Sequence, residues 1–159
     1  MGKSQVIFFT PQEGGDWGTI KVMTQIDIYY EGSLRTRCIQ AENRQEIRTD
    51  APKDNQGKGE LFSPTDLLAT ALGSCVLTLM GIAANQFKVE LPGLRLTIEK
   101  EMSSKPPRRV SRLTMHIYCP KTFDAEMTKR LESAALHCPV HQSLHPEVKQ
   151  EFFFHWGAS

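Results

Sequence analysis

The chain has 159 residues, of which 40% are apolar and 23% are charged, and its formal net charge is +1. This length predicts a single domain over residues 1–159 with a core of its own, and the composition excludes a wholly disordered chain. A charge so close to zero gives no electrostatic argument for nucleic acid as a partner.

Residues 1–18 are expected to form an N-terminal extension. Their one apolar run, Val6–Phe9, ends before Pro11 and is too short for a signal peptide. We therefore expect a cytoplasmic protein, and in that compartment cysteines are thiols at rest. The four cysteines are Cys38, Cys75, Cys119 and Cys138.

Alternation of apolar and polar residues predicts three strands before a loop at residues 50–60. These strands are expected over residues 20–30, 34–40 and 45–49. The second strand places Arg35 and Arg37 on one face, because successive side chains of a strand point to opposite faces. The loop is long enough to be functional.

The residues after this loop predict a long helix from Ser63 to Gln86. Ser63 can serve as the N-cap, Pro64 suits the first helical position, and Asp66 completes a capping box. The stretch 67–87 is uncharged, but its polar residues favour a buried central helix over a membrane span. A helix that is apolar on every side must be covered all round, which favours a dimer.

The remaining pattern predicts a hairpin, a second helix and a closing strand. The hairpin strands are expected near residues 94–98 and 113–117, the helix over 123–137, and the last strand over 148–156. The expected order is β-β-β-α-β-β-α-β. Because hairpins dominate over repeated βαβ units, we predict an α+β fold of two layers.

The residue pattern alone favours a packing role for the cysteines over a catalytic one. Cys75 lies on an apolar stripe of the long helix, and a cysteine buried in this way is normally inert. Cys138 lies among His137, His141 and His145, but the second cysteine-rich half of a structural zinc motif is missing. We expect no metal and no other cofactor. The strand positions of Cys38 and Cys119 predict core packing for both.

Two segments carry a resemblance to a known family. The first runs from Thr49-Asp50-Ala51-Pro52 through Gly57-Lys58-Gly59 to Phe62-Ser63-Pro64-Thr65-Asp66 and on to Cys75, and the second is Cys138-Pro139-Val140 followed by Ser143-Leu144. Together they resemble the OsmC/Ohr family of osmotically inducible and organic hydroperoxide resistance proteins, and its OsmC-like branch in particular. The resemblance implies an intertwined homodimer that reduces organic or inorganic hydroperoxides at its subunit interface.

The family resemblance also implies roles for individual residues. A thiolate in the position of Cys75 attacks the peroxide and becomes a sulfenic acid, and a thiol in the position of Cys138 condenses with it to a disulfide, which an external dithiol reduces. A buried thiolate needs a nearby cation. The family supplies an arginine from the early hairpin, which either Arg35 or Arg37 matches here, with Arg35 slightly favoured.

The acid that orients this arginine departs from the family pattern. Hydroperoxide resistance proteins read Asn-Pro-Glu, whereas this chain reads Ser63-Pro64-Thr65, with a carboxylate one residue later at Asp66. At about 100° per residue, Asp66 lies on the helix face opposite Cys75. Its expected role is therefore that of a cap, and a second role in orienting an arginine is left open.

Other functions are compatible with the same features. One is a non-enzymatic dimer that binds a small apolar ligand in the interface pocket. Another is a cysteine-based redox sensor, or a zinc-binding protein that uses Cys138 with nearby histidines. Consumption of hydroperoxide in the presence of a dithiol separates the enzyme from the binding protein.

Overall fold

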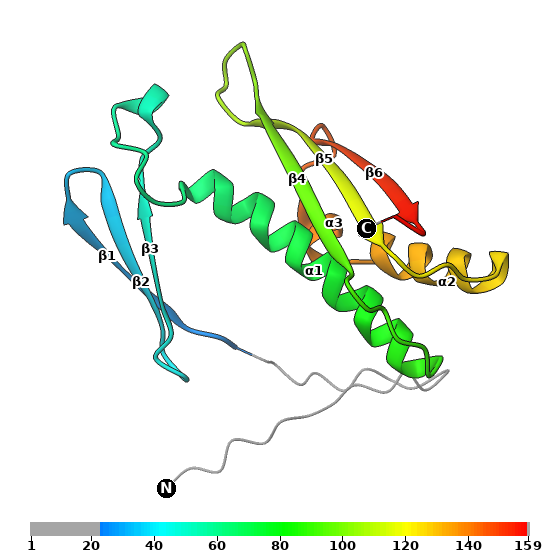
Figure 1. Ribbon diagram of the computed structural model, residues 1–159. Coiled ribbons are helices and arrows are strands. Elements are labelled where there is room, and N and C mark those ends of the chain that lie inside the picture. Colours follow the sequence, from blue (N-terminus) through cyan, green and yellow to red (C-terminus); the bar gives the residue numbers. More distant parts are fainter. Residues whose placement is uncertain (1–22, 159) are drawn as a thin grey trace, which may run out of the picture.

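The computed structural model describes residues 23–158, which form two three-stranded sheets and their connecting helices (Figure 1). The elements in chain order are β1 (Ile26–Gly32), β2 (Arg35–Gln40), β3 (Glu46–Asp50), the 3-10 turn η1 (Lys53–Asn55), α1 (Pro64–Gln86), β4 (Arg95–Met102), β5 (Val110–Cys119), α2 (Ala125–Leu136), α3 (Pro139–Ser143) and β6 (Lys149–Trp156). The expected extension 1–18 and the start of the first expected strand, residues 20–22, lie outside the described residues.

Strands β1, β2 and β3 form an antiparallel sheet with one apolar and one charged face. The apolar face carries Ile28, Cys38 and Ile47 in one cross-strand row, and the opposite face carries Tyr29, Arg37 and Arg48 in the next. On the apolar face, Ile28 is 66% exposed and Ile47 is 53% exposed. The prediction that Cys38 packs in a core is therefore wrong for the single chain, because nothing in the described part of it covers this face.

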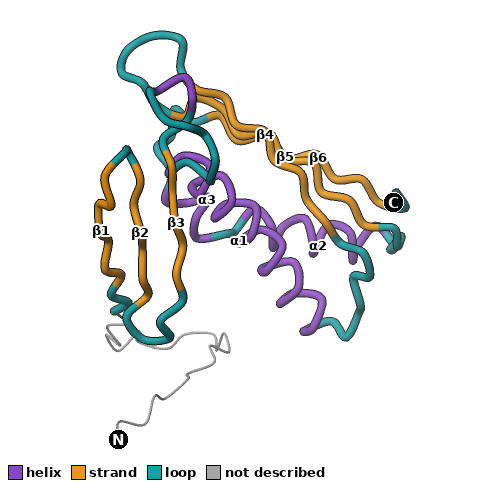
Figure 2. The backbone as a smooth tube through the Cα atoms, turned by 60° about the vertical axis from the view of Figure 1, so that its left-hand side comes forward, coloured by secondary structure: helices purple, strands orange, loops and turns teal. Residues whose placement is uncertain are grey.

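This N-terminal sheet lies apart from the other elements, as Figures 1 and 2 both show. Among the described residues, the sheet makes no substantial contact with the helices or with the second sheet. Water-exposed isoleucines lose the burial that normally stabilises a sheet, at about 25 cal/mol per Å² of apolar surface. A sheet with an open apolar face needs a cover from outside this part of the chain.

Helix α1 begins and ends where the sequence predicts. The Ser63 hydroxyl accepts a hydrogen bond from the Asp66 N–H, and the Asp66 carboxylate accepts one from the Ser63 N–H, so the capping box is complete. The helix packs closely on β4 at Gly73. A Cβ atom at that position would stand 2.9 Å from Cδ2 of Leu96, so a larger residue there would require the Leu96 side chain to move.

Strands β4, β5 and β6 form the second sheet, with the helices against one of its faces (Figure 2). Alternate residues of β5 are buried, namely Leu113, Met115, Ile117 and Cys119, and the first three belong to the core cluster that includes residues of α1 and α2. This arrangement confirms the predicted α+β class and the burial of Cys119.

The connection between β5 and β6 departs from the predicted element order. β6 pairs with β5 in parallel, so α2 and α3 form a crossover between them. Helix α3 was not predicted, because Pro139 was interpreted only as the end of the preceding helix. Proline also suits the first position of a new helix, and here it begins one whose N-cap is Cys138.

By length and composition alone, helix α1 could cross a membrane. In the structure, 39% of its most apolar 18-residue stretch is buried. Its buried side packs on α2, α3, β4 and β5. Along the other side, exposed residues follow one another at helical spacing, namely Thr70, Ala71, Ser74, Thr78 and Ile82. The described part of the chain therefore covers only one side of its central helix.

Candidate active site

The fold brings two of the four cysteines together. Cys75 lies in the middle of α1, and Cys138 is the N-cap of α3, which packs against α1. The Cys138 side chain is completely buried, whereas Cys75 is half-buried at the edge of the same core cluster. The two thiols are thus neighbours with unequal access to solvent.

Burial raises the pKa of the Cys138 thiol above its ordinary value, and the neighbouring Cys75 thiol raises this pKa further. The backbone N–H groups of His141 and Val140 act in the opposite direction. Cys138 is therefore held as a thiol at neutral pH, and a reaction that needs its thiolate must remove the proton.

Cys75 does not lie at the centre of the buried face of α1, as the predicted apolar stripe implied. The buried side of the helix runs instead through Ala69, Leu72, Val76, Met80 and Ala83, and Ile82 of the predicted stripe is 48% exposed. Cys75 therefore lies at the boundary between the core and the open side of α1.

The two candidate arginines occupy different environments on β2. Arg37 belongs to a ladder of charges on the exposed polar face, where it pairs with Glu31 at 3.1 Å and Glu46 at 3.4 Å and lies over the ring of Tyr29. Arg35 lies at the end of the sheet, where its guanidinium contacts the carboxylates of Asp50 and Glu60. Neither arginine contacts Cys75 within the described chain.

Asp50 is a buried acid that holds Arg35 in place. Its Oδ2 atom accepts the Glu60 N–H at 3.0 Å and lies 3.4 Å from Nη2 of Arg35. The Glu60 N–H lowers the pKa of Asp50, burial opposes this change, and Arg35 adds to the lowering. Nε of Arg35 and Oδ1 of Asp50 are buried without a hydrogen-bond partner among residues 23–158.

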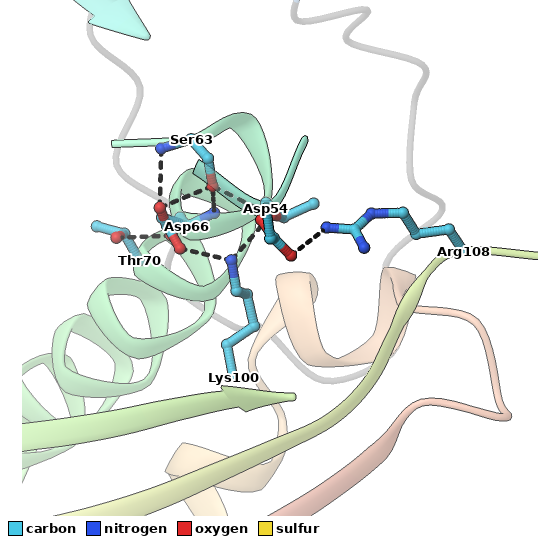
Figure 3. Close-up of polar contacts among 7 residues, drawn as sticks. Asp54, Ser63, Asp66, Thr70, Lys100 and Arg108 are labelled. Atoms are coloured by element: carbon cyan, nitrogen blue, oxygen red, sulfur yellow. Dashed lines mark hydrogen bonds and ion pairs between the residues drawn. The ribbon is translucent and has the colours of Figure 1, made fainter. Parts of the chain in front are cut away.

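Asp66, the third charged candidate, is paired with Lys100 and not with an arginine (Figure 3). Nζ of Lys100 lies 2.5 Å from Oδ1 of Asp66 and 2.9 Å from Oγ1 of Thr65. Burial works against ionisation, yet Lys100 and Ser63 together lower the pKa of Asp66. The structure thus places Asp66 in the cap, together with a lysine that the sequence analysis did not single out.

A signal for Lys100 was present in the sequence. The inward-facing positions of β4 read Leu96, Ile98, Lys100 and Met102, so one lysine interrupts an apolar row. A lysine at such a position needs an anionic partner, and the helix start supplies one. Beside this pair, a groove of about 690 Å³ is lined by residues that include Phe62, Ala69 and Ile98, and neither Cys75 nor Cys138 lines it.

The histidines near Cys138 do not assemble a metal site. Among residues 23–158, no three side chains of His, Cys, Asp or Glu converge as metal ligands. His137 Nδ1 lies 2.7 Å from the Ser133 carbonyl oxygen, and His145 Nδ1 accepts the Glu147 N–H. His141 faces β6 instead, where its Nδ1 lies 2.6 Å from Oε1 of Gln150.

The pairing of Cys75 with Cys138 on this fold can be compared with known proteins. A family model for OsmC-like proteins matches residues 57–152, which include both cysteines. The chain belongs to the OsmC-like family. A comparison with curated proteins finds no match.

Solved structures of OsmC-like proteins share the fold. One from Psychrobacter arcticus, named for an osmotic stress induced and detoxification response, is 43% identical, with a TM-score of 0.79. The match covers 86% of this chain and 98% of the Psychrobacter chain. An organic hydroperoxide resistance protein OsmC from Legionella pneumophila is 16% identical, with a TM-score of 0.70. The match covers 86% of this chain and 99% of the Legionella chain. A second organic hydroperoxide resistance protein, from Elizabethkingia anophelis, is 14% identical, with a TM-score of 0.69. The match covers 86% of this chain and 99% of the Elizabethkingia chain. The last two likenesses establish the fold alone.

The ion pair at the start of α1 predicts a specific loss of stability in acid. The pKa of Asp66 is lower in the folded OsmC-like protein than in the unfolded chain. The contribution of its carboxylate to the free energy of unfolding is therefore complete above about pH 4, and it is lost as the pH falls below that value. We expect Asp66→Asn to lower the free energy of unfolding at pH 7 by about 1 kcal/mol and to flatten its decline in acid. Urea unfolding between pH 3 and 7 measures both effects.

Glu90→Gln is the matched control for this prediction, because Glu90 is exposed and forms no ion pair among the described residues. It should leave the stability profile unchanged. Equal acid profiles for the parent and Asp66→Asn would show that the pair with Lys100 contributes nothing.

Proposed function

We propose that this protein is a thiol-dependent peroxidase that reduces organic hydroperoxides, and hydrogen peroxide as a second substrate, through Cys75 and Cys138. The observation that carries the proposal is the pairing of a half-buried thiol with a fully buried one in an OsmC-like protein. Two thiols that are neighbours in space can form a disulfide, and unequal access gives each of them a distinct role.

Exposure assigns the order of the two steps. A hydroperoxide can reach Cys75 but not the completely buried Cys138. The Cys75 thiolate attacks the O–O bond, keeps one oxygen as a sulfenic acid, and releases the other as an alcohol. Cys138 then attacks the sulfenic sulfur, so that the S–S bond forms, the S–O bond breaks and water leaves. An external dithiol restores both thiols.

A homodimer is the assembly in which this site is best completed. The open side of α1 and the apolar face of the N-terminal sheet are both uncovered within the described residues. Each can cover the other when two chains pair, with the sheet of one chain lying on the central helix of its partner. Cys75 stands at the edge of that open side and so would lie at the subunit interface.

Arg35 is the cation that we propose for the Cys75 thiolate, supplied across the subunit interface. Arg37 already has two carboxylates and a tyrosine ring on the charged face of the sheet. Arg35 also has two carboxylate partners, Asp50 and Glu60, but its buried Nε has no hydrogen-bond partner among residues 23–158. Asp50 thereby fills the orienting role for which the family uses the position of Thr65.

The thiol count tests the enzymatic proposal directly. One equivalent of cumene hydroperoxide should consume two thiols per chain and leave Cys38 and Cys119 reduced. Cys75→Ser should abolish the reaction, because a serine hydroxyl neither ionises at neutral pH nor takes up the oxygen. Cys138→Ser should complete the first step and then stop as a sulfenic acid. Stopped-flow kinetics and mass spectrometry measure both. Undiminished hydroperoxide consumption by Cys75→Ser would favour the ligand-binding alternative.

Substitution of each arginine in turn can show which of the two activates Cys75. Arg35→Gln should slow alkylation of Cys75 by iodoacetamide at pH 7 by about 10-fold or more, because a nearby cation favours the thiolate by that amount. Arg35→Lys should retain part of the rate, and Arg37→Gln should retain all of it. If Arg37→Gln slows the alkylation and Arg35→Gln does not, the assignment is reversed.

The dimer predicts opposite outcomes at neighbouring positions of β1. Ile28→Lys places a charge on the apolar face and should dissociate or unfold the dimer, whereas Tyr29→Lys alters the charged face and should leave it assembled. Sedimentation velocity at micromolar and submicromolar concentrations measures the mass. A folded parent protein that sediments with the mass of one chain would refute the dimer.

A further inference from the structure

The open face of the second sheet carries two histidine rings in direct contact. The helices lie against the other face of this sheet (Figure 2). His116 lies between two buried residues of β5, and His155 lies between two residues of β6 that pack against the core, so both histidines point away from the core. Nδ1 of His116 is 3.0 Å from Nε2 of His155. Of the five histidines in the chain, only these two contact each other among residues 23–158.

Aromatic side chains on both strands hold the two rings in place. His116 stacks on Phe153 with 5.0 Å between the ring centroids, and His155 stacks on Tyr118 with 4.6 Å between the centroids. Both stacks join residues that face each other in the β5–β6 ladder. The guanidinium of Arg95 in turn lies 4.0 Å from the centroid of the Tyr118 ring. The histidine nitrogens therefore meet on a packed support, and little side-chain freedom remains to be lost when they bind a ligand.

The two facing nitrogens can both become metal ligands without a change of charge. A hydrogen bond between two neutral imidazoles needs one donor and one acceptor, so one ring already presents a lone pair. The outer nitrogens, Nε2 of His116 and Nδ1 of His155, form no hydrogen bond within residues 23–158. The donor ring can therefore carry its proton on the outer nitrogen instead. Both lone pairs then face one point, and neutral imidazole is a common ligand of transition metals.

The distance between the two nitrogens favours one coordination geometry. With metal–nitrogen bonds of about 2.0–2.1 Å, ligands 3.0 Å apart subtend an angle of about 90° at the ion. This is the angle between adjacent ligands in square-planar and octahedral complexes, which suit Cu²⁺ and Ni²⁺. A tetrahedral zinc ion needs the nitrogens about 3.3–3.4 Å apart. Mg²⁺ and Ca²⁺ prefer oxygen ligands and do not fit a pair of imidazoles.

The charges on this face of the sheet balance. The register of the three strands places three carboxylates and three cationic side chains on the same face as the histidines, namely Glu99, Glu101, Glu151, Arg95, Arg112 and Lys149. The fixed charges therefore give no net attraction or repulsion for a cation, and the affinity of the site must come from the two imidazoles.

We propose that His116 and His155 form a binding site for one Cu²⁺ or Ni²⁺ ion on the outer face of the second sheet, with water completing the coordination. The site lies on the face away from the helix that carries Cys75, and it does not depend on the proposed peroxidase function. An ion held there joins β5 to β6, two strands that the chain connects only through the α2–α3 crossover. Because the unfolded chain does not hold the two rings together, the ion should stabilise the folded protein.

Nickel chloride is the probe for this site, because thiols do not reduce Ni²⁺. Isothermal titration calorimetry of the full chain should show one His116-dependent Ni²⁺ ion per chain, and the melting temperature should rise with the Ni²⁺ concentration. Zn²⁺ should give a smaller His116-dependent rise, because the nitrogens stand too close for tetrahedral ligation. Prior alkylation of Cys75 with iodoacetamide should leave the Ni²⁺ effect unchanged.

Variants at the two positions should remove this effect. His116→Asn and His155→Asn should each weaken Ni²⁺ binding by about 10-fold or more, because one imidazole lacks the advantage of a second ligand already in place. His116→Phe keeps an aromatic ring on the support but cannot ligate, so it should lose the Ni²⁺ effect even though the protein folds. His137→Asn is the matched control and should bind Ni²⁺ like the parent, because His137 is exposed at the end of α2, away from this sheet face.

Three results would overturn the site. The first is a parent protein that binds no Ni²⁺ at millimolar concentration. The second is equal Ni²⁺ binding by the parent and His116→Phe, which would show that the ion binds elsewhere. The third is a loss of binding in His137→Asn as large as in His155→Asn, which would place the ion at the histidines near α3. Each variant is compared by its Ni²⁺-dependent shift in melting temperature, so a change in its metal-free stability does not affect the comparison.

Discussion

Helix α1 carries no charged side chain from Leu67 to Gln86, but residues 23–158 cover it on one side only. On that side, Leu72, Val76 and Met80 are completely buried against the second sheet and the other helices. The opposite side stays open, and so does the apolar face of the N-terminal sheet. The proposed dimer accounts for both uncovered surfaces together, whereas residues 23–158 of a single chain leave both of them open.

The same one-sided burial distinguishes the two cysteines. Cys75 lies where the covered side of α1 meets the side that residues 23–158 leave open, while Cys138 lies wholly inside. A buried thiol next to a second thiol keeps its proton, as the raised pKa of Cys138 shows. In the proposed mechanism, Cys138 must therefore lose its proton before the disulfide can form.

The charged residues around α1 form two separate groups. Lys100, Asp66 and Thr65 stabilise the start of the helix, where a carboxylate also interacts favourably with the helix dipole. Arg35, Asp50 and Glu60 join the end of the N-terminal sheet to the loop before the helix. The first group is internal to one chain and satisfied, whereas in the second the buried Nε of Arg35 has no hydrogen-bond partner among residues 23–158. This difference is why we assign the first to stability and the second to the thiolate.

The sequence by itself determined the local elements of this protein. The capping box at Ser63 and Asp66, the alternation along β4 and β5, and the family motifs around Cys75 and Cys138 are short-range patterns, and each predicted its element or its family correctly. Only the tertiary structure decided that Asp66 pairs with Lys100, that Arg35 is held by Asp50, and that Gln150 orients His141. These contacts join residues that are 34, 15 and 9 positions apart. No periodicity within one element encodes such pairs, because they depend on how the sheets and helices pack.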